Sequence, residues 1–213
     1  TKAIPKEMLP IIDKPLIQYA VEEAIEAGFD ELIFITGNTK KAITEHFDDK
    51  PNLNISNLTE DKKKFLSQMY KIIPDHVSCK YIVQEEPLGL GHAILQAKQI
   101  INDEPFAVIL ADDLIDSKTG VLKQMVDLYK DTKSSIISVH KIDKAYSAQY
   151  GIASIADKSQ KIMKLTDIVE KPQPEEAPSN LGVVGRYIFC NEILQSLENI
   201  SFGTGNEIQL TDG

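Results

Sequence analysis

The sequence predicts an α/β protein built on a mixed, mostly parallel sheet flanked by helices, with an antiparallel elaboration in its last third. Two observations lead to this class. Up to about residue 140, apolar runs typical of strands alternate with helical segments, which is the pattern of βαβ units. After that point, three β-like runs follow one another with little helix between them.

The first helix shows the clearest periodicity. In residues 15–27 the apolar side chains recur on one helical face, with Pro15 at the start and Gly28 as the stop. A short apolar strand, ELIFITG, comes next, followed by a helix over residues 39–47. Residues 51–60 are expected to form a loop, and residues 61–73 a helix that ends before Pro74.

The remaining elements follow the same two periodicities. Strands are expected at CKYIVQ, FAVILADD and SSIISVHKI, and helices at GHAILQAKQII and residues 121–130. In the last third, strands are expected at IASIAD, KIMKLTDIVE and GVVGRYIF, with a final helix at NEILQSLENI. We expect ligands at the carboxyl ends of the parallel strands, where open α/β sheets bind them.

Composition narrows the class of partner. The chain has 213 residues, enough for one domain with a sizeable core, and a formal net charge of -9. This acidic balance argues against broad binding to nucleic acid or to an anionic membrane. A nucleotide is still compatible, because it needs only a few local cations and backbone N–H groups.

Cysteine usage and hydropathy indicate a cytoplasmic protein. Cys79 and Cys190 form no CxxC pair, and we expect two buried thiols in a reducing compartment. No apolar run is long enough to span a bilayer, and no signal peptide is visible.

A pair of aspartates ends the most apolar strand. In FAVILADD, Asp112 or Asp113 could hold Mg²⁺, which prefers oxygen ligands and phosphate partners. The alternative for this pair is a helix cap or a solvated turn.

Two further strand ends carry candidate ligand-binding groups. Gln84 precedes a glycine turn at Gly89, so an amide and exposed backbone could meet a base, although a plain strand–turn–helix is the alternative. Glu170 and Lys171 could bind sugar hydroxyls and a phosphate, or simply form a charged turn. His92 is assigned no role.

The opening stretch, TKAIPKEMLP, places lysines among prolines. It could be a frayed tail, a surface loop or one wall of an anion site. No nucleophile motif or zinc-binding pattern is present in the sequence. The inventory of lysines, a strand-end aspartate and glycine turns suits phosphoryl or nucleotidyl transfer, in which the protein positions groups and neutralises charge.

Seven segments in order resemble the bacterial UTP–glucose-1-phosphate uridylyltransferases of the sugar-nucleotidyltransferase family. They are TKAIPKEMLPIIDKPLIQY, GLGHAI, ILADD, the YG turn at 150–151, VEKP, PSNLGVVGRY and GNEIQLTD. The resemblance implies a Rossmann-like nucleotidyltransferase fold. In the family, a GxGTR loop on a first β-strand precedes the first segment, and further strands and helices follow the last. We therefore expect residues 1–213 to be a single nucleotidyltransferase domain truncated at both ends.

The resemblance also implies site residues. Lys6 would contact the phosphates, and Asp112 would bind Mg²⁺. Gln84 and the Gly89 turn would recognise uracil. The glucose pocket would be lined by Gly151, Glu170, Asn180 and the backbone near Gly185, while Lys171 would hold the phosphate of glucose 1-phosphate.

The implied reaction transfers a uridylyl group from UTP to glucose 1-phosphate, giving UDP-glucose and pyrophosphate by Mg²⁺-assisted in-line displacement. The alternatives are a sister sugar-phosphate nucleotidyltransferase that uses dTTP or CTP, and a catalytically silent fragment that binds nucleotide-sugar. Family members are commonly homo-oligomers, so we expect one here, with no nucleic-acid or membrane partner.

Overall fold

The computed structural model describes residues 4–37, 41–47, 58–63, 65, 71–156, 162–201, 203 and 206–213. Its helices are α1 (Leu16–Glu26), α2 (Lys41–Phe47), α4 (Leu90–Gln96), α5 (Lys98–Ile101), α6 (Val121–Thr132) and α7 (Glu192–Asn199). Short 3-10 turns occur at η1 (Lys6–Met8), η2 (Lys144–Gln149) and η4 (Leu210–Asp212). Within these residues, no helix is long and apolar enough to cross a membrane.

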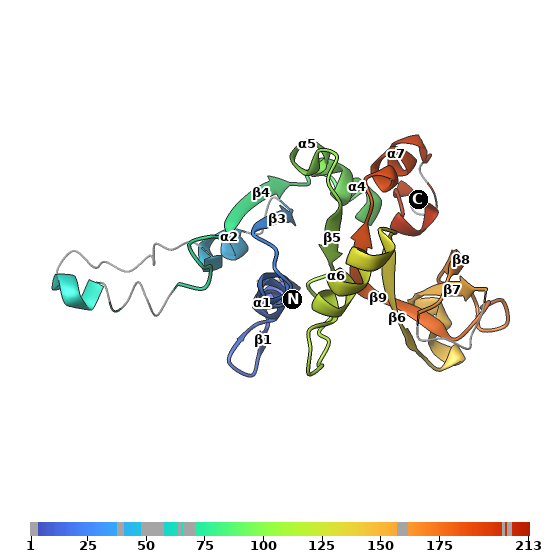
Figure 1. Ribbon diagram of the computed structural model, residues 1–213, viewed down its shortest axis with the longest axis horizontal. Coiled ribbons are helices and arrows are strands. Elements are labelled where there is room, and N and C mark those ends of the chain that lie inside the picture. The colour runs from blue at the N-terminus through green and yellow to red at the C-terminus, as the bar shows by residue number, and fades with distance from the viewer. Residues whose placement is uncertain are drawn as a thin grey trace.

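The strands form three hydrogen-bonded groups (Figure 1). They are the hairpin β1 (Pro10–Ile11) and β2 (Lys14–Pro15), the parallel pair β3 (Glu31–Thr36) and β4 (Ser78–Val83), and a five-stranded sheet of β5 (Phe106–Ile109), β6 (Ile136–Lys141), β7 (Gly151–Ile155), β8 (Leu165–Glu170) and β9 (Leu181–Phe189).

The α/β class and the mixed sheet are confirmed, but the described strand pairs are mostly antiparallel, so the expectation of a mostly parallel sheet is wrong for this part of the chain. Strand β9 lies between β5 and β6 and is antiparallel to both. Strand β7 pairs with both β8 and β9, also in antiparallel fashion. Among the strand pairs that the structure describes, the parallel one is β3 with β4.

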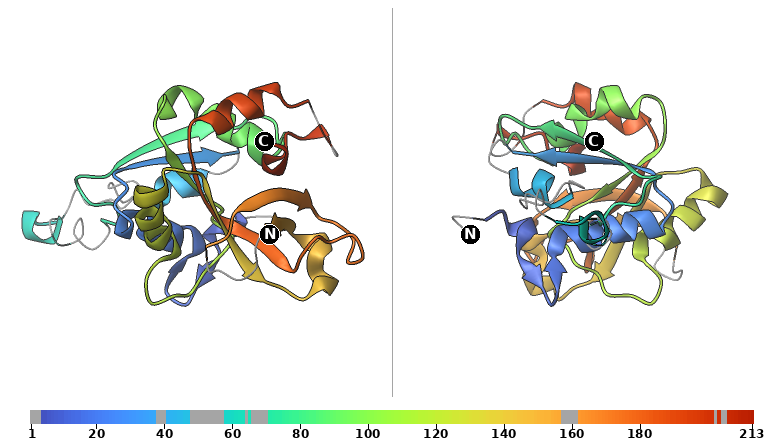
Figure 2. Two further views of the ribbon diagram at one scale, coloured as in Figure 1. Left: turned by 45° about the vertical axis from the view of Figure 1, so that its right-hand side comes forward. Right: turned by 90° about the vertical axis from the view of Figure 1, so that its left-hand side faces the viewer.

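Strand β9 is buried on both faces, and this organises the core. Tyr187 and Phe189 pack with α4 and α7 in one apolar cluster. Ile188, which points to the opposite face, packs with residues of α1 and α6 such as Ala24 and Leu122. The two helix pairs accordingly lie on opposite sides of the sheet (Figure 2). The charged side chains that follow β5 and β8 remain accessible, with Asp112 43% and Lys171 59% exposed.

A groove of about 530 Å³ separates β3 from β5. Its lining is mostly apolar and comes from both strands together with α1 and α4, including Ala20, Ala24, Ile94 and Ala97. The groove therefore lies between the parallel pair and the five-stranded sheet.

Three expectations differ from the structure, and a fourth falls mostly outside the described residues. The helix expected over 91–101 is interrupted at Ala97, so that α5 begins at Lys98. Of the helix expected over 61–73, the described residues are helical at 60–63 and 65, whereas 71–73 lie outside any helix. The loop expected at 51–60 falls mostly outside the described residues. Cys79 and Cys190 are half-buried rather than buried.

Candidate functional site

The structure brings together Lys6 and Asp112, which are 106 residues apart in the chain. Lys6 begins the η1 turn, and its Nζ donates to Asp112 Oδ2 at 2.5 Å. The carboxylate of Asp112 raises the pKa of Lys6 through this hydrogen bond and through its charge, more than partial burial lowers it. Both side chains remain exposed to solvent, at 61% for Lys6 and 43% for Asp112. A cation and an anion thus meet on an accessible surface at the carboxyl end of β5.

The structure also separates the roles of the two neighbouring aspartates. Asp113 turns its Oδ2 toward β9, where it accepts a hydrogen bond of 2.8 Å from the N–H of Gly185. Asp112 instead faces Lys6. Of the two carboxylates, Asp112 is therefore the one presented toward the lysine and the solvent.

The donor groups at the carboxyl end of β5 suit a magnesium ion that is shared with a substrate. Mg²⁺ is usually held by one or two carboxylates together with substrate phosphates, rather than by an all-protein cage. Asp112 supplies one such carboxylate, and the described residues contain no cluster of three or more His, Cys, Asp or Glu side chains that could hold a metal. The residues present fit this mode of binding.

Gln84 and Gly89, the predicted base-binding residues, are in contact. The side-chain nitrogen of Gln84 lies 3.2 Å from the carbonyl oxygen of Gly89 and 2.9 Å from Nδ1 of His92. His92, which was assigned no role from the sequence, therefore lies beside the Gln84 amide. Gly89 has a φ of +98°, and a Cβ there would lie 2.6 Å from the carbonyl oxygen of Ile208. A side chain at position 89 would be excluded by both conformation and packing.

Gly151, Glu170 and Lys171 also lie together. Gly151 pairs with Glu170 across β7 and β8, and a Cβ on Gly151 would lie 3.3 Å from Glu170 Oε2. Lys171 has a φ of +45°, and its N–H donates to the carbonyl oxygen of Tyr150 at 3.0 Å. Its Nζ lies 3.3 Å from Glu170 Oε1. A non-glycine residue in this conformation is uncommon and is often found at ligand-binding sites.

A buried tyrosine connects this cluster with the end of β5. Burial raises the pKa of Tyr187 to about 12, and the negative charges of Asp113 and Glu170 both contribute. Tyr187 of β9 is thus close enough to feel the charges of both Asp113, which follows β5, and Glu170, which ends β8.

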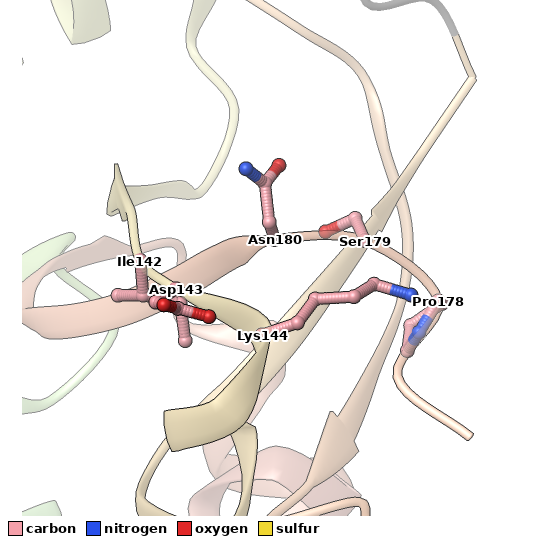
Figure 3. Close-up of a pocket in the computed structure, with 6 residues that line it drawn as sticks. All are labelled: Ile142, Asp143, Lys144, Pro178, Ser179 and Asn180. Carbon is pink, nitrogen blue, oxygen red and sulfur yellow. The ribbon is translucent and has the colours of Figure 1, made fainter. Parts of the chain in front are cut away.

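Asn180 is placed differently from the other predicted sugar-binding residues. It lines an open pocket of about 470 Å³ together with Ile142, Asp143, Lys144, Pro178 and Ser179. Figure 3 shows its side chain pointing away from that of Lys144. Gly151 and Glu170 are not among the residues that line this pocket. Asn180 precedes β9, in which Gly182 pairs with Ile152, the residue after Gly151.

Gly185 also has a role that the sequence did not indicate. Its N–H donates to Asp113, and its carbonyl oxygen accepts from the N–H of Leu110 at 2.9 Å. Both backbone groups are thus engaged within the protein, at the end of β5, instead of facing a glucose pocket.

The sequence analysis did not predict the roles of two charged residues that lie behind the turn carrying Asp112. Arg186 is 1% exposed and is bonded to Glu23 of α1. The sequence contained one sign of this pair: an arginine inside the apolar run GVVGRYIF must find a partner if the strand is buried. It contained no sign of which acid that partner would be.

Comparison with known proteins identifies the relatives of this chain. The sequence model of the family described as "Nucleotidyl transferase" matches residues 1–212. A UTP–glucose-1-phosphate uridylyltransferase of Bacillus subtilis strain 168 is 47% identical over 212 residues, which is 100% of this chain and 72% of that protein. A protein of the same name from Pseudomonas aeruginosa is 45% identical over 214 residues and is covered to 76%.

Solved structures give the same result. A UDP-glucose pyrophosphorylase in complex with UDP-glucose superposes with a TM-score of 0.86 at 43% identity, covering 99% of this chain and 77% of that one. A UTP-bound enzyme of the same kind from Acinetobacter baumannii has a TM-score of 0.85 at 40% identity, with 99% and 74% covered.

Proposed function

The chain belongs to the nucleotidyl transferase family, and we propose that it transfers the uridylyl group of UTP to glucose 1-phosphate, releasing pyrophosphate. The observation that carries this proposal is the meeting of Lys6 and Asp112 at the carboxyl end of β5. The relatives that carry the name of this activity, and the solved relative with UDP-glucose bound, support it.

In this mechanism a phosphate oxygen of glucose 1-phosphate attacks the α-phosphorus of UTP in line with the leaving pyrophosphate. One P–O bond forms as the other breaks, and no covalent intermediate with the enzyme is required. Lys6 neutralises the phosphates of UTP, and Lys171 holds the phosphate of the sugar. Glu170 accepts hydrogen bonds from sugar hydroxyls. Positioning and charge neutralisation therefore supply most of the rate enhancement.

Asp112 would hold Mg²⁺ together with the substrate phosphates. The ion would supply charge stabilisation to the phosphoryl oxygens and to the leaving pyrophosphate. The pairing of Asp112 with Lys6 keeps this carboxylate compensated when no substrate is present. The same pairing holds Nζ of Lys6 beside the proposed metal position, where it can contact the phosphates of UTP.

Gln84 would present its amide oxygen to the base. The amide nitrogen of Gln84 donates to the carbonyl oxygen of Gly89 and lies 2.9 Å from Nδ1 of His92. The oxygen that is left is an acceptor, which complements the N3–H of uracil. Cytosine has an acceptor at N3 and would be rejected by the same oxygen.

A direct assay tests this function. The full-length protein should release pyrophosphate from UTP and glucose 1-phosphate in the presence of Mg²⁺, and Asp112→Ala should abolish most of this activity. Full activity of Asp112→Ala would show that the metal assignment is wrong.

Two alternatives give different results. A sister enzyme would prefer dTTP or CTP, or another sugar phosphate, in a panel of substrates. A catalytically silent protein would bind UDP-glucose in calorimetry and release no pyrophosphate under any of these conditions. Size measurement in solution would test the homo-oligomer that we also propose, and cell fractionation would test a cytoplasmic location.

A further inference from the structure

A buried arginine lies directly behind the proposed metal corner. Arg186 belongs to β9 and is 1% exposed, so its charge must be satisfied by protein groups. Its guanidinium donates to two elements at once. One side meets the carboxylate of Glu23 in α1, and the other meets backbone carbonyls at the end of β5.

The carboxylate of Glu23 connects three elements. Its Oε2 accepts from Nε and Nη2 of Arg186 at 2.9 and 2.8 Å. Its Oε1 accepts from the N–H of Leu122, in the first turn of α6, at 2.9 Å. Because Gly120 at the helix N-cap has no side chain to cap the helix, Glu23 performs that function from α1. The orientation of Arg186 is therefore fixed by α1 and α6 together.

The other side of the guanidinium holds the turn that carries Asp112. Nη1 donates to the carbonyl oxygen of Leu110 at 3.3 Å, and Nη2 donates to that of Asp113 at 3.0 Å. The turn is closed by a hydrogen bond of 3.1 Å from the N–H of Asp113 to the carbonyl oxygen of Leu110. Asp112 lies between these two carbonyls. Its backbone is thus held on both sides by the same arginine.

The backbone of β9 is shaped to make this contact. The pairing of β6 with β9 shifts register between Ile137 and Val139, opposite the segment that contains Gly185 and Arg186. A Cβ on Gly185 would lie 2.5 Å from both Asp113 Oδ2 and Leu110 Cβ, so only glycine permits this close approach. Irregularities of this kind in strands often re-aim side chains next to active sites.

From these contacts we propose that Glu23 and Arg186 are positioning residues that fix the 110–113 turn, and with it the metal-binding geometry of Asp112. This inference rests on the proposed function, because it takes Asp112 as the magnesium ligand. With side chains 1% and 12% exposed, Arg186 and Glu23 are too buried to serve as substrate or metal contacts in this proposal. They act by holding the backbone carbonyl groups on both sides of Asp112. This positioning effect is separate from any contribution of the buried ion pair to the stability of the fold.

The test uses Mn²⁺ as a spectroscopic probe for the metal. Arg186→Lys keeps the positive charge but loses the planar fork, and Glu23→Gln keeps an acceptor for Leu122 but loses the charge. In the full-length protein saturated with UDP-glucose, each variant should weaken Mn²⁺ binding, measured by electron paramagnetic resonance, by about tenfold or more. The affinity for UDP-glucose measured without metal should stay within about twofold, because the sugar and base contacts are unchanged.

Two further variants separate the possible outcomes. Phe189→Leu loosens the same strand away from the turn, so it should lower the melting temperature and leave Mn²⁺ affinity unchanged. Asp112→Asn should weaken Mn²⁺ binding more than either positioning variant. If Arg186→Lys does not fold, as judged by circular dichroism, Glu23→Gln carries the test.

Wild-type Mn²⁺ affinity in the folded positioning variants, with a large loss in Asp112→Asn, would overturn the positioning role alone. Unchanged Mn²⁺ affinity in Asp112→Asn itself would overturn the metal assignment in the proposed function, and the positioning role with it.

Discussion

At the scale of single residues, the chemistry of the site depends on charges that are exposed and lightly held. Lys6 and Asp112 compensate one another on the surface, and an exposed ion pair contributes little to stability. Their proposed value lies in the reaction, where the phosphates and the metal engage the same two groups. Substitutions here should therefore separate activity from folding.

Lys6→Gln is the sharpest test of this separation. Removal of one contact that stabilises transition-state charge typically costs about 2.7–4 kcal/mol, so the turnover rate should fall by about 10²–10³-fold. The melting temperature should change little, because the side chain is 61% exposed. Lys14→Gln is the control, since Lys14 lies just before α1 and is paired with Glu22 of that helix, and it should leave turnover unchanged. Equal losses in the two variants would contradict a specific role for Lys6.

The proposed role of Gln84 leads to a prediction about how the protein selects UTP over CTP. Gln84→Ala removes the proposed acceptor for N3–H, which should raise the KM for UTP by about tenfold, the equivalent of one hydrogen bond. The preference for UTP over CTP should fall with it. His92→Ala should show a smaller change in the same direction, because it frees the amide of Gln84 without removing it. An unchanged ratio of UTP to CTP rates in Gln84→Ala would exclude this assignment.

At the scale of elements, the sequence predicted well the features that depend on local interactions, such as the ends of α1. The apolar periodicity of residues 15–27 marked α1 to within a residue at each end, and Gly28, with a φ of +96°, ends it. The interruption at Ala97 was not predicted, because nothing in the sequence QAKQ breaks a helix. Strand pairing was the harder problem, since the position of β9 between β5 and β6 depends on contacts far apart in the chain.

The same contrast between local patterns and contacts far apart in the chain explains which features of the site could be predicted. Sequence motifs identified Lys6 and Asp112, which the fold then brings together. They did not predict that Asn180 would line a pocket with Ile142 and Lys144, because the path of the chain before β9 decides that placement. The pair of Glu23 and Arg186 could not be matched from sequence, because 163 residues separate its members and several acids were equally available.

The β1–β2 hairpin gives a prediction about stability. Its tip residue, Ile12, has a φ of +63° and is 96% exposed. A β-branched residue in this conformation is strained by about 1–2 kcal/mol and gains nothing here from burial. Ile12→Asn should therefore raise the free energy of unfolding by about 1 kcal/mol, measured by urea denaturation. Ile11→Asn, at the neighbouring strand position with negative φ, should give no such gain, and equal effects would argue against strain at the tip.

At the scale of the whole molecule, the most informative feature is the groove between β3 and β5. Side chains of α1 and α4 line it together with the two strands, so anything within it would be covered by helices and flanked by strand edges. Such surroundings suit a strand with apolar residues on both faces, as is typical of buried parallel strands. This chain covers 72% of the Bacillus subtilis relative, and the family resemblance implies a strand of this kind, ending in a glycine-rich loop, in the family's first signature.

We therefore expect that a version of the protein with that strand attached ahead of Thr1 will place it in the groove and join the two sheets. Amides of β3 and β5 should become more protected in hydrogen exchange, because their open edges would gain hydrogen-bond partners. The melting temperature should rise, by about 2–4 °C for each kcal/mol gained at this chain length. The matched control carries the same extension with a proline at its centre, which cannot donate to the ladder and should lose most of the gain. Protection that rises equally with both extensions would mean that the strand does not pair in the groove, whereas a gain specific to the proline-free strand would show that the two sheets become one.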